Sequence, residues 1–193
     1  ITRAEKTAIL FEPNDPNEEA QHITYRILYE RVCRMANVLK DQGIQKGDRV
    51  CIYLPMIPEM IYSVLACARV GAVHSVIFAG FSATAISTRI NDCECKMVIT
   101  SDGSYRGKKT IDLKGIIDEA LKDCTYVDSV LVAKRTNTEV NMVDGRDHWL
   151  APLMNNASPL HNAEIMDAED PLFILYTSGS TGSPKGMLHT TAG

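Results

Sequence analysis

Residues 50–78 read VCIYLPMIPEMIYSVLACARVGAVHSVIF, which is two short apolar runs with a helical pattern between them. The runs Val50–Leu54 and Val73–Phe78 are typical of buried strands. Between them, Pro58 occupies a position that a helix favours for its first residue, and Gly71 suits the helix end. The stretch therefore predicts a strand, a helix and a second strand, which is the repeating unit of a parallel sheet.

The same alternation continues on both sides of this unit. Thr24 to Gly43 predicts a helix before the first strand, with Thr24 as its cap. Apolar periodicity predicts further elements in the following order: a helix capped by Ser82, a strand at Met97–Thr100, a helix at Leu113–Leu121, a strand at Ser129–Ala133 and, after Pro171, a strand at Leu172–Tyr176. We therefore predict an α/β fold with an open, mostly parallel sheet and helices on both faces.

The segment Lys134–Asp170 interrupts the alternation and is rich in turn-forming residues. We predict a surface excursion there, with a short helix around Trp149–Met154. Trp149 is expected to anchor the excursion on the domain.

Composition narrows the class of protein. The 193 residues are 45% hydrophobic and 23% charged, which is ordinary for a globular protein. A net charge of −4 gives no whole-chain attraction to nucleic acid or to an anionic membrane. The most apolar window, Met60–Phe78, contains Arg69, so it predicts a buried helix and strand rather than a membrane span.

The six cysteines favour reduced thiols and a cytoplasmic protein. Cys33, Cys51 and Cys67 lie in apolar periodic segments, where a thiol packs as a small hydrophobic group. The pair Cys93-x-Cys95 has no second pair at a spacing typical of zinc sites. No metal ligands of the protein itself are therefore predicted.

The residues that follow the last predicted strand, 177–186, read TSGSTGSPKG. Glycines free the backbone to adopt positive φ, and successive N–H groups in such turns converge on an anion. The hydroxyl side chains add donors, and Lys185 adds a positive charge. A strand followed by this combination favours polyphosphate binding.

Two other interpretations of this loop fit its residues less well. A Walker A loop requires glycine and lysine followed by a hydroxyl residue, but Pro184 and Gly186 occupy the positions of the second glycine and the hydroxyl. A flexible glycine and serine linker is the other alternative. An apolar strand directly before the loop and a proline–lysine pair within it argue against a linker.

The stretch Tyr176–Gly186 resembles the hallmark loop of the adenylate-forming superfamily. Its flanks, Ala168–Leu175 and Leu188–Thr191, resemble the AMP-forming acetyl-CoA synthetases, and so do Tyr53–Glu59 and Val73–Phe81. The resemblance extends from about Ala8 to Gly193. It implies that residues 1–193 are an incomplete AMP-binding N-terminal domain, with the C-terminal domain absent from this chain.

The resemblance also implies an activity. Members of this family convert acetate, ATP (with Mg²⁺) and coenzyme A to acetyl-CoA, AMP and pyrophosphate through an acetyl-adenylate. A propionyl-CoA or other short-chain acyl-CoA synthetase and a non-catalytic nucleotide- or CoA-binding module are the alternatives. The chain alone is expected to be inactive, because the family's acid pocket and C-terminal lysine follow this loop; no catalytic residue is assigned.

Two groups of site residues follow from the resemblance. The role of binding ATP phosphates is carried onto Thr177, Ser178, Gly179, Ser180, Thr181, Gly182 and Lys185. The role of binding the phosphates of coenzyme A is carried onto Arg106, Gly107, Lys108 and Lys109. From the residues alone, a solvated basic surface is the favoured interpretation of the second group.

Three further residues receive structural predictions. Tyr176 is expected to anchor the strand end rather than to contact ATP. His74 is expected to be a hydrogen-bonded core residue rather than a catalyst. The family often has arginine at the position of Lys109, and lysine would keep the charge but lose bidentate geometry.

Overall fold

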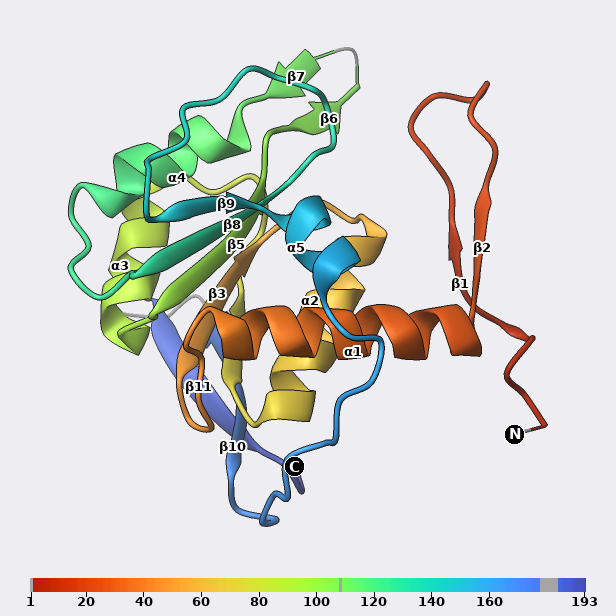
Figure 1. The fold of residues 1–193 in the computed structure, drawn as a ribbon. Helices are drawn as coiled ribbons and strands as arrows, with labels where there is room; N and C mark the ends of the chain where they lie inside the picture. Colours follow the sequence, from red (N-terminus) through yellow and green to blue (C-terminus); the bar gives the residue numbers. More distant parts are fainter. Residues whose placement is uncertain (1, 108, 178–183) are drawn as a thin grey trace.

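The computed structural model describes residues 2–107, 109–177 and 184–193, and its centre is a seven-stranded sheet (Figure 1). The strand order is β11-β10-β4-β3-β5-β8-β9. The bounds are β3 (Arg49–Tyr53), β4 (Val73–Val76), β5 (Met97–Ser101), β8 (Ser129–Ala133), β9 (Asp147–Trp149), β10 (Pro171–Thr177) and β11 (Lys185–Thr190). All neighbouring pairs are parallel except β10 and β11, which confirms the predicted open, mostly parallel sheet.

Helices cover both faces of this sheet, as predicted (Figure 1). The bounds are α1 (Tyr25–Asp41), α2 (Pro58–Val70), α3 (Ala83–Cys93), α4 (Leu113–Leu121) and α5 (Leu150–Asn156). Helices α1, α2 and α5 share one hydrophobic core, and α3 and α4 share another. Strand β3 contributes to both, because Val50 and Ile52 face the first core and Cys51 and Tyr53 face the second.

The helix boundaries follow from local sequence signals. The Thr24 hydroxyl accepts a hydrogen bond from the Ile27 N–H, and the Ser82 hydroxyl accepts one from the Ala85 N–H. Helix α2 begins at Pro58 and ends at Val70, and Gly71 caps it in the left-handed conformation with φ of 71°. These capping predictions are confirmed.

Several short strands were not predicted. Strands β1 (Thr7–Phe11) and β2 (Gln21–Thr24) form a hairpin that projects from the body of the molecule (Figure 1). Strands β6 (Ser104–Arg106) and β7 (Lys109–Ile111) form a second hairpin. The strands of the β6–β7 hairpin are short and mostly exposed, so they lack the apolar runs by which strands are predicted from sequence. Strand β1 does carry a short apolar run, Ala8–Phe11, so it could have been predicted.

The excursion between β8 and β10 is anchored as the sequence indicates. The predicted short helix is α5, and Trp149 at the end of β9 packs against the second core. The Lys134 ammonium lies 5.0 Å from the centre of the Trp149 ring, within the range of a cation–π interaction.

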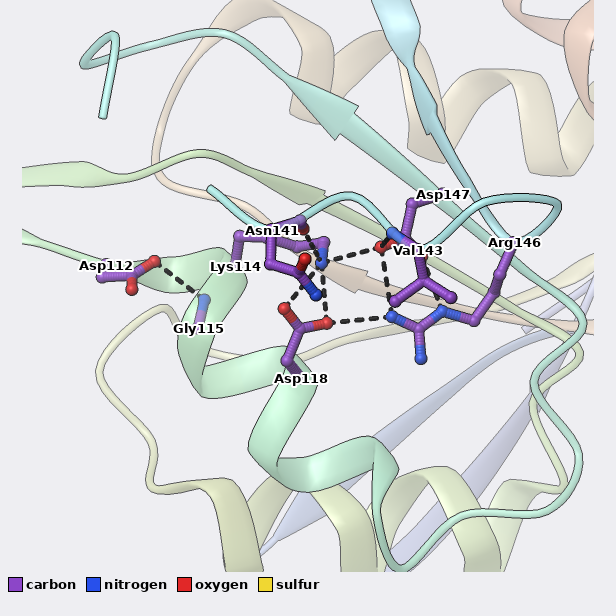
Figure 2. A network of polar contacts seen from close by, with 8 residues as sticks. All are labelled: Asp112, Lys114, Gly115, Asp118, Asn141, Val143, Arg146 and Asp147. Atoms are coloured by element: carbon purple, nitrogen blue, oxygen red, sulfur yellow. Dashed lines mark hydrogen bonds and ion pairs between the residues drawn. The ribbon is translucent and has the colours of Figure 1, made fainter. Parts of the chain in front are cut away.

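A buried ionic cluster also holds this excursion, and the sequence analysis missed it (Figure 2). The fully buried Lys114 of α4 donates to the Asp118 carboxylate at 2.6 Å, to the Asn141 carbonyl at 2.8 Å, and pairs with Asp147 at 2.8 Å. Arg146 pairs with Asp118 at 2.9 Å and with Asp147 at 2.6 Å. Burial alone would raise the pKa of Asp147, but hydrogen bonds from Arg146, Lys114 and the backbone lower it.

Cysteine packing agrees with the sequence analysis. All six cysteines are free, and Cys33, Cys51 and Cys67 are buried as predicted.

Within the described ranges, none of the helices combines the length and the apolar character that crossing a membrane requires.

Candidate active site

The β10–β11 hairpin brings together the two ends of the predicted phosphate loop. Thr177, the last residue of β10, lies directly opposite Lys185, the first residue of β11. Both are exposed, so the hydroxyl and the ammonium are accessible to a ligand. The other residues predicted to bind ATP lie outside the described residues: Ser178, Gly179, Ser180, Thr181 and Gly182.

Tyr176 fixes the start of this loop against the end of α3. Its hydroxyl donates to the Asp92 carboxylate and lies 3.0 Å from the Cys93 thiol. The Arg89 guanidinium lies 5.3 Å from the centre of its ring. These contacts agree with the prediction that Tyr176 anchors the strand end.

Gly186 does not provide the positive φ that was expected of the glycines in this loop. It lies in the extended strand β11, opposite Tyr176, and not in a conformation with positive φ. A β-carbon at this position would lie 3.2 Å from the Tyr176 ring. The expectation of positive φ is therefore wrong for Gly186, and the absence of a side chain makes room for the tyrosine ring.

Three of the predicted CoA-binding residues, Arg106, Gly107 and Lys109, lie at the turn end of the β6–β7 hairpin. Arg106 is paired with Lys109 in the strand register, and Gly107 adopts a φ of 61°. Such positive φ values are typical of the tight turns that close hairpins. Arg106 and Lys109 are exposed and, in the described part of the chain, have no ion-pair partner. Lys108 lies outside the described residues.

The described residues of the two predicted sites lie on separate elements of the fold. The β6–β7 hairpin follows the carboxyl end of β5, whereas β10 and β11 lie at one edge of the sheet (Figure 1). A ligand at the basic turn and a ligand at the phosphate loop would therefore be held by separate elements.

Asp102, which the sequence analysis missed, holds the base of the basic hairpin. Its buried Oδ1 accepts hydrogen bonds from the N–H groups of Gly103 at 2.8 Å, Arg135 at 2.7 Å and Thr136 at 3.0 Å. These bonds tie the end of β5 to the segment after β8. A β-carbon on Gly103 would lie 2.9 Å from the Ile111 carbonyl oxygen, so a side chain there would disturb the hairpin. An aspartate directly after an apolar strand is the signal that could have identified this residue.

A separate cleft of about 320 Å³ lies between the β1–β2 hairpin, α2, α5 and the end of β8. Its lining includes Phe11, Arg31, Ile57, Tyr62, Arg135 and Leu150. The described residues of the two predicted sites do not line it. It is therefore not the cavity of either predicted site.

His74 is a core residue, but one part of its prediction is wrong. Its ring is buried and stacks on Phe173, which in turn stacks on His189 at 4.4 Å between ring centres. The Nδ1 atom has no hydrogen-bond partner in the described structure, whereas a hydrogen-bonded histidine was expected. Burial lowers the pKa of His74 to about 4, so the imidazole is neutral near pH 7.

The described residues contain no group of three or more histidine, cysteine, aspartate or glutamate side chains placed to hold a metal ion. The involvement of Mg²⁺ with ATP stays a prediction.

Comparison with known families decides the affiliation of the chain. The family model described as AMP-binding enzyme matches residues 2–193. The chain belongs to the AMP-binding enzyme family. The predicted superfamily is thereby confirmed, and the loop at Thr177–Gly186 lies inside the region that matches the AMP-binding model.

The chain is also similar to individual members of the AMP-binding family. It is 58% identical to acetyl-coenzyme A synthetase 2 of Pseudomonas aeruginosa, covering 99% of this chain and 30% of the relative. It is 58% identical to acetyl-coenzyme A synthetase of Rhodobacter capsulatus, covering 99% of this chain and 29% of the relative. The chain thus spans less than a third of the length of these two relatives.

A solved structure supports the fold. Acetoacetyl-CoA synthetase from Streptomyces lividans matches with a TM-score of 0.88 and 30% identity, over all of this chain and 29% of that protein. The predicted fold, part of the N-terminal region of an adenylate-forming enzyme, is confirmed by this match.

Proposed function

We propose that residues 1–193 form part of the N-terminal, AMP-binding domain of an acetate–CoA ligase. The full enzyme would convert acetate, ATP and coenzyme A to acetyl-CoA, AMP and pyrophosphate through an acetyl-adenylate. The observation that carries this proposal is 58% identity to acetyl-coenzyme A synthetases over 191 residues, a range that includes the phosphate loop. The C-terminal domain would be a separate part of the enzyme.

The chemistry explains why such an enzyme needs a phosphate-binding loop. A carboxylate is a poor acyl donor, because its charge repels nucleophiles and its oxygen is a poor leaving group. Transfer of AMP to acetate corrects both defects, but charge then develops on the departing pyrophosphate. Holding the β- and γ-phosphates still and stabilising that charge lowers the barrier of this step.

The geometry around the loop supports this role. Thr177 and Lys185 lie opposite each other in the hairpin, so a hydroxyl donor and an ammonium flank the loop on its two sides. We assign the phosphates of Mg·ATP to these two residues together with Ser178, Gly179, Ser180, Thr181 and Gly182. Thr181 is assigned as a hydroxyl donor and Lys185 as the charge partner.

We assign the phosphates at the nucleotide end of coenzyme A to the basic turn Arg106–Lys109. The turn presents two cationic side chains that are exposed and lack an ion-pair partner within the described residues. The left-handed Gly107 exposes backbone at the tip of the hairpin.

Six free thiols support placement of the enzyme in the cytoplasm.

Acetate-dependent exchange of pyrophosphate into ATP tests this function in the full-length protein. We expect exchange with acetate, and none with the isolated 193-residue chain. Faster exchange with propionate would assign a different short acid. Binding of ATP and coenzyme A without exchange would identify a binding module, and turnover by the isolated chain would contradict the assignment of the remaining parts.

A further inference from the structure

The β6–β7 hairpin is a small element that needs support from the rest of the fold. It forms a two-stranded sheet of its own, and each of its strands is three residues long. Two-stranded hairpins are marginally stable at best in water, because they bury too little apolar surface to offset the loss of backbone entropy. The position of the cationic side chains Arg106 and Lys109 therefore depends on what the hairpin contacts.

The side chain of Arg135 supplies such a contact. Its guanidinium lies 5.3 Å from the centre of the Tyr105 ring on β6, within the range of a cation–π interaction. It also lies 5.5 Å from the centre of the Phe11 ring on β1, and it donates to the Asn14 side-chain oxygen at 2.8 Å. One partly buried guanidinium thus connects the two hairpins labelled β1–β2 and β6–β7 in Figure 1.

The backbone of Arg135 is itself fixed relative to the base of the β6–β7 hairpin. Asp102 Oδ1 accepts hydrogen bonds from the N–H groups of both Gly103, which precedes β6, and Arg135, which lies after β8. Because the Asp102 carboxylate is buried, these bonds are stronger than they would be in water. The guanidinium therefore reaches Tyr105 from a fixed origin. Asp102 restrains the base of the hairpin, and Arg135 restrains the strand that leads to the turn.

Strand pairing places Arg135 against the face of the hairpin opposite the cationic side chains. Tyr105 is paired with Thr110 in the strand register. The next pair toward the turn is Arg106 and Lys109. Residues directly opposite each other share one face of a hairpin, and successive residues alternate between its faces. Tyr105 therefore lies on the face that contacts Arg135. Arg106 and Lys109 lie on the other face, where both are exposed.

We propose that Arg135 is a positioning residue for the binding of coenzyme A. Its guanidinium holds the hairpin by the face of Tyr105, so that the cationic face is presented to the phosphates at the nucleotide end of coenzyme A. In this arrangement Arg135 does not touch the ligand, because it lies against the opposite face. The inference rests on the proposed function, which assigns those phosphates to the turn that carries Arg106 and Lys109.

Steady-state kinetics of the full-length enzyme test the positioning role. Arg135→Ala should raise the KM for coenzyme A by about twofold to fivefold, because an exposed cation–π contact contributes modestly to stability. The kcat at saturating coenzyme A and the rate of acetate-dependent pyrophosphate exchange should stay at their wild-type values. Arg135→Lys should recover only part of the KM, since an ammonium keeps the charge but lacks the planar guanidinium.

Lys134→Ala is the matched control for these measurements. It removes the neighbouring cation, which lies over the Trp149 ring and not over Tyr105, so the KM for coenzyme A should not change. The inference fails alone if Arg106→Ala and Lys109→Ala raise this KM while Arg135→Ala leaves it at the wild-type value.

A double-mutant cycle tests whether Arg135 acts through Tyr105. Tyr105→Ala should raise the KM for coenzyme A by a similar factor, whereas Tyr105→Phe, which keeps the ring, should not. The double variant Arg135→Ala/Tyr105→Ala should be no worse than the more affected single variant, because both changes break the same contact. Fully additive effects would show that Arg135 acts by another route and would overturn the inference.

Hydrogen exchange separates this inference from the proposed function. The backbone amides of residues 104–107 and 109–111 should exchange faster in Arg135→Ala than in the wild type, and Lys134→Ala should not change them. Unchanged exchange in Arg135→Ala would show that the guanidinium does not hold the hairpin. If Arg106→Ala and Lys109→Ala both leave the KM for coenzyme A unchanged, the assignment of coenzyme A to the turn fails, and the positioning role fails with it. The exchange rates would then still show whether Arg135 holds the hairpin.

Discussion

Two groups of cationic side chains in this protein have opposite surroundings. Lys114 is buried, and with Arg146 it is paired to Asp118 and Asp147 (Figure 2). Arg106, Lys109 and Lys185 are exposed at turns and have no ion-pair partner within the described residues. The comparison indicates that a buried positive charge is used to hold the fold, and that positive charge left unpaired on turns is available to a ligand.

The largest expected effect tests the buried group. Asp147→Asn removes a carboxylate that accepts from both Lys114 and Arg146. Because a buried ammonium then loses a counter-charge, we expect the free energy of unfolding to fall by about 3–5 kcal/mol in chemical denaturation. Asp144→Asn, on the same excursion but exposed, is the control and should change stability little. A loss below about 1 kcal/mol for Asp147→Asn would show that the cluster is not structural.

Substitution in the exposed group should lower activity and leave stability nearly unchanged. We expect Lys185→Ala in the full-length enzyme to slow acetate-dependent pyrophosphate exchange by about a hundredfold, because it removes a charge that stabilises the leaving pyrophosphate. Thermal unfolding should change little, since the side chain is exposed. Lys122→Ala, another exposed lysine, controls for loss of charge alone. If Lys185→Ala exchanged pyrophosphate at the wild-type rate, the role assigned to Lys185 would be wrong.

His74 differs from both groups of cations, because it is a buried titratable group that has no ionic partner among the described residues. Its pKa is about 4 in the folded protein against an ordinary value of 6.5, so between these values the unfolded chain binds the additional proton. Stability should therefore fall as the pH is lowered through this range, by roughly 2 kcal/mol at pH 5.

Denaturation at a series of pH values measures this effect. His74→Phe should flatten the dependence between pH 6.5 and pH 4, whereas His22→Asn, on the exposed β2 strand, should leave it unchanged. An identical slope in His74→Phe and the wild type would mean that another group controls acid stability.

The smallest expected effect concerns the basic turn. Lys109→Ala should raise the KM for coenzyme A by up to about fivefold, because an exposed ionic contact contributes little in water. Pyrophosphate exchange, which precedes the entry of coenzyme A, should not change. Lys109→Arg should keep or lower the KM, since a guanidinium can contact phosphate with two donors. An altered exchange rate in Lys109→Ala would remove the turn from the CoA site.

The fold was predictable wherever burial leaves a local pattern. Helix α4 and strand β8 have the predicted bounds, because each presents apolar residues at its own period. Strand β4 is shorter than predicted, since the apolar run extends past its end at Val76. The β1–β2 hairpin was missed although Ala8–Phe11 is a short apolar run, because β2 is only four residues long and has a single buried apolar residue, Ile23.

Interactions between distant positions were not predictable in the same way. From its local sequence, Lys114 is expected to lie on the exposed face of a helix. It is buried instead because it pairs with Asp147, which is distant in the sequence. For the candidate site, the phosphate-binding chemistry of the loop could be predicted from its composition and its resemblance to a known family. The position of Thr177 directly across from Lys185 could not, because it depends on strand β11, which was not predicted. The position of the basic turn likewise depends on Asp102, which no periodic pattern marks.

The three amides bound by Asp102 have a consequence for how this protein can change in evolution. One carboxylate oxygen fixes Gly103, before the basic hairpin, and both Arg135 and Thr136, after β8. An inserted residue at either place would displace the other segment as well, so the two loops cannot lengthen independently at their bases. Length variation among relatives should therefore concentrate farther along the excursion, between Asn137 and Asp144, where the chain is largely exposed.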